Sequence, residues 1–454
     1  LWAGLVFPAP SVCAASQSDL PPAHRIGINL SSTNYYSSEF VFTDIFKQSQ
    51  PWQENWESPE AEEQGLILDE KGWVQALAPD QIAETLLYRV QGHYPSGEYV
   101  CVYSGQGEME LDFDAQVVHS EPGRIVFQVT HPSPDGIALR LTETDIIDPL
   151  QDIAIYPPGF EPNTAPTFHP QFVQHWQDFQ ILRFMDWMQT NNSGIVDWKD
   201  RPFPEAQTQG GPQGVALEYM IELANTLHAD PWFCMPHKAS EDYIRRFATM
   251  VRDRLDPDLK AYVEYSNEVW NCQFEQAEYC RDLGSGLGLS EEPFQAQLMY
   301  YAQRAVEVFQ IWEEVFGGTE RLVRVLSSQF ANPWVSDKVL SSEQAYAQAD
   351  ALAVAPYFGQ SLGSPEGAES TALTPVDSIL AACEQEIVES GEIIAEHSAI
   401  AKKYGLRLVA YEGGQHLVGS LGAENNEQLT ELFIAANRDE RMQDLYDLHL
   451  GTWY

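Results

Sequence analysis

The stretch Ala261-Tyr-Val-Glu-Tyr-Ser-Asn-Glu-Val-Trp-Asn271 is the most informative in the chain, because an apolar run that indicates a buried strand ends there in Asn267-Glu268. A second stretch, Leu406-Arg-Leu-Val-Ala-Tyr-Glu-Gly-Gly-Gln-His416, again ends a β-type run on a carboxylate, Glu412. The two carboxylates are 412 − 268 = 144 positions apart. Glycoside cleavage uses one carboxyl group as acid/base and another as nucleophile or second base. Two carboxylates at strand ends therefore suggest this chemistry.

Strand and helix patterns alternate along the chain from about residue 165. Three further apolar runs have the length of strands: Ile181-Leu-Arg-Phe-Met-Asp-Trp187, Pro231-Trp-Phe-Cys-Met-Pro-His237 and Ala351-Leu-Ala-Val-Ala-Pro-Tyr-Phe358. Apolar residues at helical spacing predict helices near residues 170–179, 217–227, 243–255, 293–316, 376–404 (with a break around Gly391) and 427–448. This alternation predicts a parallel sheet with crossover helices.

The five segments, taken in chain order, resemble glycoside hydrolase clan A. These are the cellulase-like (β/α)8 enzymes in which Asn-Glu closes strand 4 and a nucleophilic Glu closes strand 7. The resemblance implies an α/β protein with a TIM barrel. It also implies that Glu268 is the acid/base and Glu412 the nucleophile of a retaining mechanism. Such a mechanism requires no cofactor, and no Cys/His spacing in the sequence suggests a zinc site.

Four further residues lie where the resemblance would put supporting or substrate-binding groups: Arg183, His237, Asn267 and Tyr357. Two more candidates for substrate binding, Trp187 and Trp270, follow strand ends. Arg183 would lie near the nucleophile, and Tyr357 would hydrogen-bond Glu412. Asn267 would hold a sugar 2-hydroxyl, His237 would line the cleft, and the two tryptophans would stack on sugar rings. Each residue type also has an ordinary structural role in ion pairs, hydrogen bonds or packing, and the sequence leaves that alternative open.

Seven barrel strands can be counted, starting with His24-Arg-Ile-Gly-Ile-Asn-Leu30, including a further run Leu322-Val-Arg-Val-Leu-Ser327, and ending with the run before Glu412. A complete barrel has eight strands. Relative to the resemblance, the sequence therefore looks truncated before the eighth strand, unless a strand lies unrecognised in residues 191–204. A barrel without that strand would expose a sheet edge.

Between the first strand and residue 160, the pattern changes to short alternating strands such as Glu98-Tyr-Val-Cys-Val-Tyr103, separated by turn signals. We interpret residues 65–160 as an antiparallel β-sandwich inserted after the first barrel strand. The other expected parts are a signal remnant and linker (1–23), the first barrel strand and its loop (24–64), and the remainder of the barrel (161–454). The insert either supports the barrel or offers tyrosine faces to a glycan chain: Tyr94, Tyr99 and Tyr103.

The composition limits the possible partners. The chain has 454 residues, 44% of them apolar, and a formal charge of −42 from 67 acidic and 25 basic residues. Nucleic acids and anionic membranes bind basic faces, so the charge argues against both. The expected partner is a polysaccharide or oligosaccharide, and the sequence does not indicate the oligomeric state. The acidic residues, with a local cluster at 57–63, indicate a strongly solvated surface suited to salty surroundings.

The first residues, Leu1-Trp-Ala-Gly-Leu-Val-Phe7 and Ser11-Val-Cys-Ala-Ala15, have the pattern that ends a signal peptide. They predict a secreted protein, extracellular or periplasmic. If Cys13 leaves with the signal, five of the six cysteines remain, an odd count that does not describe a disulfide scaffold. Export permits a disulfide between Cys272 and Cys280 without requiring one.

The leading hypothesis is a secreted, endo-acting hydrolase of β-linked polysaccharide, with cellulose or another β-glucan ahead of mannan and xylan. One alternative is a carbohydrate-binding protein that keeps the barrel but has no turnover, although the intact Glu268 and Glu412 argue against it. Another is an exo-acting glycosidase on oligosaccharides. Product profiles would separate the two enzymes, because endo action gives mixed oligosaccharides and exo action gives a single short product.

Overall fold

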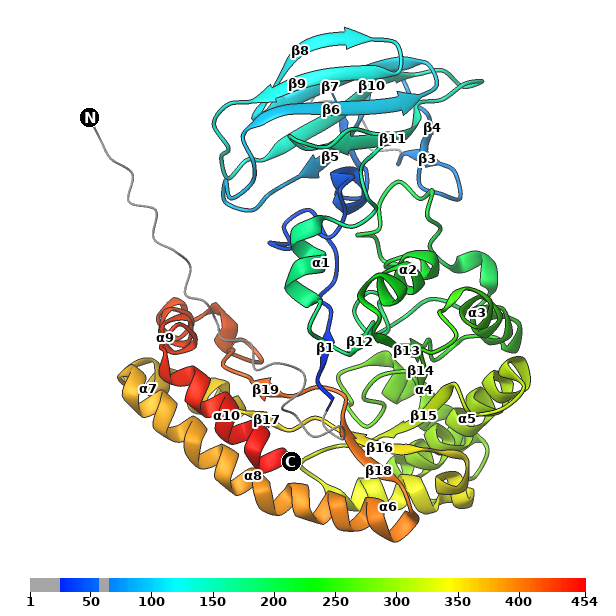
Figure 1. The fold of residues 1–454 in the computed structure, drawn as a ribbon, viewed down its shortest axis with the longest axis vertical. Helices are drawn as coiled ribbons and strands as arrows, with labels where there is room; N and C mark the ends of the chain where they lie inside the picture. The colour runs from blue at the N-terminus through cyan, green and yellow to red at the C-terminus, as the bar shows by residue number, and fades with distance from the viewer. Residues whose placement is uncertain (1–24, 57–64) are drawn as a thin grey trace.

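The computed structural model describes residues 25–56 and 65–454. Its largest sheet has seven parallel strands, in the order β1-β12-β13-β14-β15-β16-β18, and curls like part of a barrel (Figure 1). The strands are β1 (Gly27–Asn29), β12 (Ile181–Arg183), β13 (Asp230–Met235), β14 (Ala261–Tyr265), β15 (Leu322–Ser327), β16 (Ala351–Val354) and β18 (Arg407–Ala410). Spatial order follows chain order, which confirms the predicted parallel sheet. Within the described ranges, no eighth strand joins it.

Helices separate most of the successive strands and surround the sheet (Figure 1). They are α1 (Pro170–Trp176), α2 (Leu217–Leu227), α3 (Glu241–Arg254), α4 (Glu275–Gly286), α5 (Pro293–Phe316), α6 (Pro333–Ser341), α7 (Ala368–Ala372) and α8 (Val376–Tyr404). α5 begins on a proline and ends at the left-handed Gly317, which are the residues expected at these two helix positions. Apolar faces of α1 to α6 and of the strands form one continuous core, whereas α7 and most of α8 pack in a second cluster with the C-terminal helices.

Two helix predictions were wrong. α8 is not broken at Gly391 but runs unbroken for 29 residues. A Cβ atom at Gly391 would come within 3.3 Å of Thr452 Cγ2, so this glycine allows a neighbouring helix to pack closely. That neighbouring helix is α10 (Arg441–Trp453). The second wrong prediction concerns the same region: one helix was predicted over 427–448, but two helices form, α9 (Glu427–Asn437) and α10. No strand forms in residues 191–204, which removes that alternative for the missing strand.

The first and last strands of the parallel sheet are connected through a side chain. β1 pairs with β12 and β18 pairs with β16. At the carboxyl end of β1, Asn29 Nδ2 donates a 3.0 Å hydrogen bond to the Tyr411 carbonyl, which directly follows β18. Beyond the sheet, a short parallel pair extends this end of the molecule: β17 (Tyr357–Phe358) and β19 (Gly414–Gln415).

Two four-stranded antiparallel sheets form the other part of the molecule (Figure 1). One contains β2 (Gln53–Trp56), β5 (Gln81–Leu87), β10 (Ile137–Thr144) and β7 (Gly107–Phe113), and the other β11 (Gln151–Tyr156), β6 (Gly97–Ser104), β9 (Arg124–Val129) and β8 (Ala115–Glu121). Leu139 of the first sheet and Phe127 of the second belong to one hydrophobic core. Antiparallel strands were predicted here, whereas the face-to-face sandwich and its boundaries at 65–160 stay predictions. Tyr94 and Tyr99 are buried, so their faces are closed to a glycan.

The loop between β12 and α2 fixes the antiparallel part to the parallel sheet. The backbone amides of Gln207 and Gln209 donate to the carbonyls of Lys71 and Lys47, at 2.9 and 2.7 Å. Trp73 Nε1 donates to a carbonyl of the same loop at 2.9 Å. Because this loop leaves the carboxyl end of β12, the antiparallel part is attached on the side of the sheet where the strand-end residues lie.

The signal remnant at 1–23 and the acidic cluster at 57–63 lie outside the described residues. Among the described cysteines, Cys272 and Cys280 are both free, so the disulfide considered between them is not formed. In the described part of the chain, no helix is both long and apolar enough to cross a membrane.

Candidate active site

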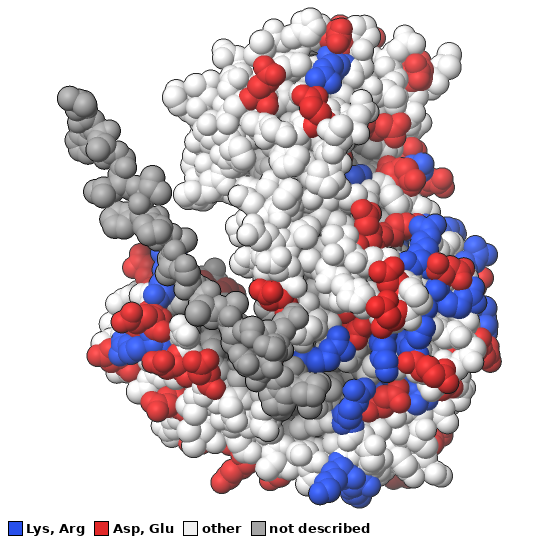
Figure 2. Space-filling model, viewed as in Figure 1, with Lys and Arg blue, Asp and Glu red and all other residues white. Residues whose placement is uncertain are grey.

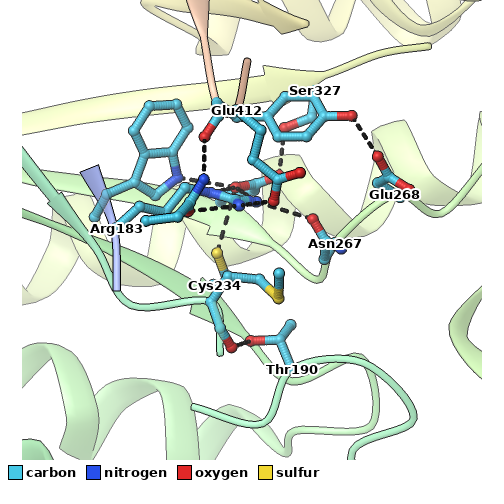
Figure 3. A network of polar contacts seen from close by, with 12 residues as sticks. Arg183, Thr190, Cys234, Asn267, Glu268, Ser327 and Glu412 are labelled. Carbon is cyan, nitrogen blue, oxygen red and sulfur yellow. Dashed lines mark hydrogen bonds and ion pairs between the residues drawn. The ribbon is translucent and has the colours of Figure 1, made fainter. Parts of the chain in front are cut away.

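The carboxyl ends of the parallel strands bring several predicted site residues to one edge of the sheet. Arg183 ends β12, Asn267 and Glu268 follow β14, and Glu412 follows β18. Tyr357 lies in β17, just beyond the end of β16. Figure 3 shows Arg183 at the centre of the polar contacts that connect these elements.

Arg183 uses its whole guanidinium group in this cluster and is only 2% exposed. Nε and Nη2 donate to Glu264 Oε2 at 3.3 and 3.0 Å, and Nη2 also donates to Asn267 Oδ1 at 2.9 Å. Nη1 donates to Glu412 Oε1 at 2.8 Å and to Asn29 Oδ1 at 3.2 Å. A guanidinium has five N–H donors, and these five contacts account for all of them. Arg183 is therefore held in one orientation by residues in or just after three other strands of the sheet, β1, β14 and β18.

Both oxygens of Glu412 have a donor. Arg183 binds Oε1, and the Tyr357 hydroxyl donates a short hydrogen bond to Oε2. Burial raises the pKa of Glu412 above its usual value, while the Arg183 charge and the Tyr357 hydrogen bond oppose part of that rise. The nearby negative charge of Glu268 adds to the rise, so the two predicted catalytic carboxylates interact electrostatically.

Glu268 is tied to the residue next to Glu412 in the sequence. The Tyr411 hydroxyl donates to Glu268 Oε1 at 2.7 Å, and Asn271 Nδ2 donates to Oε2 at 3.0 Å. The backbone around Glu268 is unusual, because Ser266 has φ of 61° and Glu268 has φ of 43°. Left-handed backbone at non-glycine residues is uncommon and gathers at functional sites. This turn aims the Glu268 carboxylate at Tyr411.

Asn267 has protein partners on both side-chain atoms. Its Oδ1 accepts from Arg183, and its Nδ2 donates to Asn191 Oδ1 at 3.0 Å. Gln276 Nε2 donates to the same Asn191 oxygen at 2.7 Å and to the Asn267 carbonyl at 2.8 Å. Asn267 is therefore fixed from two sides, and its second amide hydrogen has no partner among these contacts.

His237 follows β13 and is 1% exposed, yet neither ring nitrogen has a hydrogen-bond partner. Its ring meets that of Tyr279 edge to face, with 5.2 Å between the ring centroids. Burial, and then the neighbouring Lys238 charge, lower the pKa of His237 to about 4. The imidazole is therefore neutral at neutral pH.

The two predicted tryptophans lie in different surroundings. Trp270 has its ring centroid 6.1 Å from that of Tyr411, so it lies beside the carboxylates. Trp187 is 1% exposed and packs against Phe172 and Phe184, while its Nε1 donates to the Ser31 carbonyl. Its faces are covered by the core, so Trp187 offers no open platform to a sugar ring.

Several members of the cluster were missed by the sequence reasoning, among them Glu264 and Tyr411. Glu264 lies in the middle of β14 and is fully buried, where it accepts both contacts from Arg183. A charged residue inside the otherwise apolar run Ala261–Tyr265 was a signal that could have identified it, because a carboxylate is rarely buried without partners. Tyr411 was missed because nothing in the sequence shows that its side chain points toward Glu268.

One group of described residues has metal-ligating atoms within 4.8 Å of one another: His228, Asp256 and Asp258. His228 and Asp258 are exposed. All three precede β13 or β14, at the amino ends of the strands, so the group lies opposite the Arg183 cluster. The cluster around Arg183 itself can hold a proton on a carboxyl group and present a second carboxylate as nucleophile, which requires no metal ion.

Comparisons with known proteins gave only distant structural similarity. No family model matches the chain, and no curated protein matches it. The chain is similar to the Clostridium thermocellum endo-1,4-β-D-xylanase 10B with its CBM22-1 and GH10 modules, at 8% identity and a TM-score of 0.36, over 85% of this chain and 92% of that one. It is also similar to Bacteroides uniformis β-glucuronidase 2, at 9% identity and a TM-score of 0.26, over 76% of this chain and 44% of that one. Likeness this low assigns no activity to the chain.

Proposed function

We propose that this protein is a glycoside hydrolase that cleaves β-linked polysaccharide, with cellulose or another β-glucan as the favoured substrate. One observation carries the proposal: two strand-end carboxylates are joined through a single polar cluster. The Tyr411 hydroxyl binds Glu268, and the adjacent Glu412 binds Arg183, which also binds Asn267. A paired acid and nucleophile held by fixed donors is the arrangement that glycoside cleavage needs.

In the proposed reaction, Glu412 attacks the anomeric carbon while Glu268 gives a proton to the glycosidic oxygen. The bond between the anomeric carbon and the leaving oxygen breaks, and a bond between that carbon and Glu412 forms. A water molecule then attacks the same carbon, passes a proton to Glu268 and releases Glu412. Two displacements at one carbon retain its configuration, so the first-formed product should have the β configuration.

The environment of Glu412 suits a nucleophile. Arg183 and the Tyr357 hydroxyl stabilise its ionised form, which opposes the effect of burial. Asn267, with one amide hydrogen still available, would hold the sugar 2-hydroxyl. His237 is as buried as Trp187, so we assign it no sugar hydroxyl; its neutral imidazole packs against Tyr279 after β13. Trp270 is 6% exposed and belongs to the core, so it would meet a sugar ring only at this small exposed part beside Glu268.

The remaining expectations belong to this proposal. The protein would be secreted, as the pattern of its first residues suggests, and it would act outside the cell on its polysaccharide. The antiparallel part, predicted as an inserted β-sandwich at about residues 65–160 and joined by β2 (Gln53–Trp56) from before that range, would support the loop following β12. Its buried tyrosines favour that supporting role over glycan binding.

The test is release of reducing ends from a panel of β-glucans, xylan and mannan by the protein and by Glu412→Gln. We expect release by the unchanged protein on at least one substrate and none by Glu412→Gln, because an amide cannot act as the nucleophile. Glu313→Gln is the matched control, since Glu313 also pairs with an arginine, Arg324, at 2.7 Å but near the amino end of β15. Release by Glu412→Gln equal to that of Glu313→Gln would refute the proposed role.

The products of the same assay address mode and stereochemistry. Mixed oligosaccharides would support endo action, and a single short product would support the exo-acting alternative. Proton NMR during the first minutes should detect the β anomer of the new reducing end before mutarotation. An α anomer formed first would contradict retention and would indicate direct attack by water.

A further inference from the structure

A third carboxylate, Glu264, lies beneath the proposed catalytic pair. It is in the middle of β14 and is fully buried. Its Oε2 accepts hydrogen bonds from Arg183, from Trp232 Nε1 at 2.9 Å and from Cys234 Sγ at 3.4 Å. Its Oε1 accepts a short hydrogen bond from the Ser327 hydroxyl. Strands β12, β13 and β15 thus all donate to one side chain of β14.

Packing alone does not explain a carboxylate at this position. The residues that flank Glu264 in β14, Val263 and Tyr265, are buried as well, so the position lies in the core of the sheet. Burying a charged pair costs more than well-packed apolar residues of similar size, and an apolar replacement of such pairs is often neutral or stabilising. A buried Arg183–Glu264 pair therefore points to a role other than stability.

The donors of Arg183 are divided between the two carboxylates. Nε and one hydrogen of Nη2 bind Glu264, whereas Nη1 binds Glu412 on the far side of the same guanidinium. Because the guanidinium is planar and rigid, fixing one edge on Glu264 fixes the direction in which Nη1 points. The remaining hydrogen of Nη2 binds Asn267, so the orientation set by Glu264 also reaches the residue before Glu268.

We propose that Glu264 is a positioning residue for the cleavage reaction. It orients Arg183 toward Glu412, and its negative charge offsets part of the positive charge with which Arg183 stabilises ionised Glu412. This inference rests on the proposed function of Glu412 as nucleophile. With Glu264 charged, Arg183 stabilises ionised Glu412 less than a solitary arginine would. Glu264 thereby keeps Glu412 basic enough to attack while Arg183 holds it in place.

The charged and titratable groups that face Glu412 come from every neighbouring strand. They are Arg183 in β12, Cys234 in β13, Glu264 in β14, Glu268 after β14, Tyr357 in β17 and Tyr411 after β18. Burial raises the pKa of Glu412 most, Arg183 and Tyr357 lower it, and Glu268 and Glu264 raise it. Removing only the charge of Glu264 should therefore let Glu412 ionise at lower pH.

Glu264→Gln tests this inference, because an amide keeps the shape of the side chain and an oxygen that can accept from Arg183. We expect the acid limb of the kcat/KM profile to move to lower pH by about one unit, as for loss of one nearby charge in a partly shielded interior. Attack should be slower at the pH plateau, since a less basic carboxylate is a weaker nucleophile. The control Glu313→Gln should leave both the limb and the plateau unchanged.

A second readout does not depend on catalysis. In protein labelled with 13C at the glutamate carboxyl carbons, the Glu412 signal is assigned by its absence in Glu412→Gln and titrated against pH. We expect a shift to lower pH in Glu264→Gln and none in Glu313→Gln. If that shift occurs in a protein that hydrolyses no glycoside, the electrostatic effect of Glu264 on Glu412 is supported and the proposed function is refuted. If glycosides are hydrolysed and neither readout moves, the inference about Glu264 is overturned.

Ser327→Ala keeps the inference testable if Glu264→Gln does not fold. It removes the hydroxyl that donates to Glu264 Oε1, and loss of a donor favours the neutral form of a buried carboxyl group. A neutral Glu264 leaves more of the Arg183 charge to stabilise ionised Glu412, so the Glu412 titration should move to lower pH, as in Glu264→Gln. A shift to higher pH, or no shift, in folded Ser327→Ala would count against the inference.

Discussion

At the scale of single residues, one buried cation organises the candidate site. Arg183 is the only described cation in hydrogen-bond contact with Glu412 or Glu264, and it also binds the two asparagines Asn29 and Asn267. Two carboxylates can be buried together because the guanidinium lies between them. The proposed nucleophile and the residue before the proposed acid are thereby held by the same side chain.

Tyr357→Phe should show how much the second donor to Glu412 contributes. Loss of a hydrogen bond to a charged group should lower kcat by about 10- to 100-fold. Because the Tyr357 hydroxyl lowers the pKa of Glu412, its removal raises that pKa, and the acid limb of the activity profile should move to higher pH. Tyr346→Phe, outside the site, is the control. An unmoved limb with full kcat would show that the Tyr357 hydrogen bond is irrelevant to Glu412.

His237 should make folding stability depend on pH. Its pKa is about 4 in the folded protein, below the ordinary value near 6.5 in the unfolded chain. The folded state therefore binds fewer protons, and stability that is present above about pH 6.5 is lost as the pH falls toward 4, by up to about 3 kcal/mol. Denaturant unfolding at both pH values should show this loss reduced in His237→Gln but not in the exposed-site control His175→Gln. Equal losses in all three proteins would contradict the shift.

At the scale of elements, sequence patterns sufficed where local signals and packing agree. α5 was predicted to the residue, because Pro293 and Gly317 mark its ends and an apolar face lies between them. α8 was predicted with a break because glycine disfavours helix, but at Gly391 the close approach of Thr452 outweighs that preference. The strand ends gave Glu268 and Glu412. The contacts that orient them, from Glu264 and Tyr411, depend on tertiary packing that no local pattern carries.

The connection between β1 and β18 makes Asn29 important to the sheet. Asn29→Ala removes the hydrogen bond to the Tyr411 carbonyl and the acceptor for Arg183 Nη1. We expect a loss of about 2 kcal/mol of unfolding free energy together with reduced kcat. Asn225→Ala is a matched control, since Asn225 also makes two hydrogen bonds, with the Arg254 carbonyl and the Asp256 amide, away from the cluster. The Asn225→Ala variant should lose stability and keep kcat. An equal loss of kcat in both variants would show that Asn29 has no specific role in the candidate site.

At the scale of the whole molecule, charge is the dominant feature. The net charge is −42, and Figure 2 shows acidic side chains spread over the visible face while basic ones gather mainly on one side. Several of those basic residues belong to α3, where Arg245 and Arg246 form ion pairs with acidic partners. Paired charges reduce local repulsion, but the large excess of acidic residues remains and repels itself across the surface.

Salt should therefore leave the protein folded and active. Raising NaCl from about 0.1 M to about 2 M shortens the screening length from about 10 Å to under 3 Å, which weakens the repulsion among carboxylates. We expect the thermal midpoint Tm to stay constant or rise over this range, with activity retained. A steep fall in Tm across the series would show that the acidic surface does not favour salty surroundings.

Azide rescue can distinguish the proposed acid/base, Glu268, from the proposed nucleophile, Glu412. Glu268→Ala and Glu412→Gly are each assayed on activated aryl β-glycosides of glucose, xylose and mannose, with and without azide, which can occupy the space left by the missing carboxylate. We predict that azide accelerates Glu268→Ala to give a β-glycosyl azide and Glu412→Gly to give an α-glycosyl azide. Hydrolysis by the unchanged protein with no azide product from either variant, or with the two anomers exchanged, would contradict the assignment.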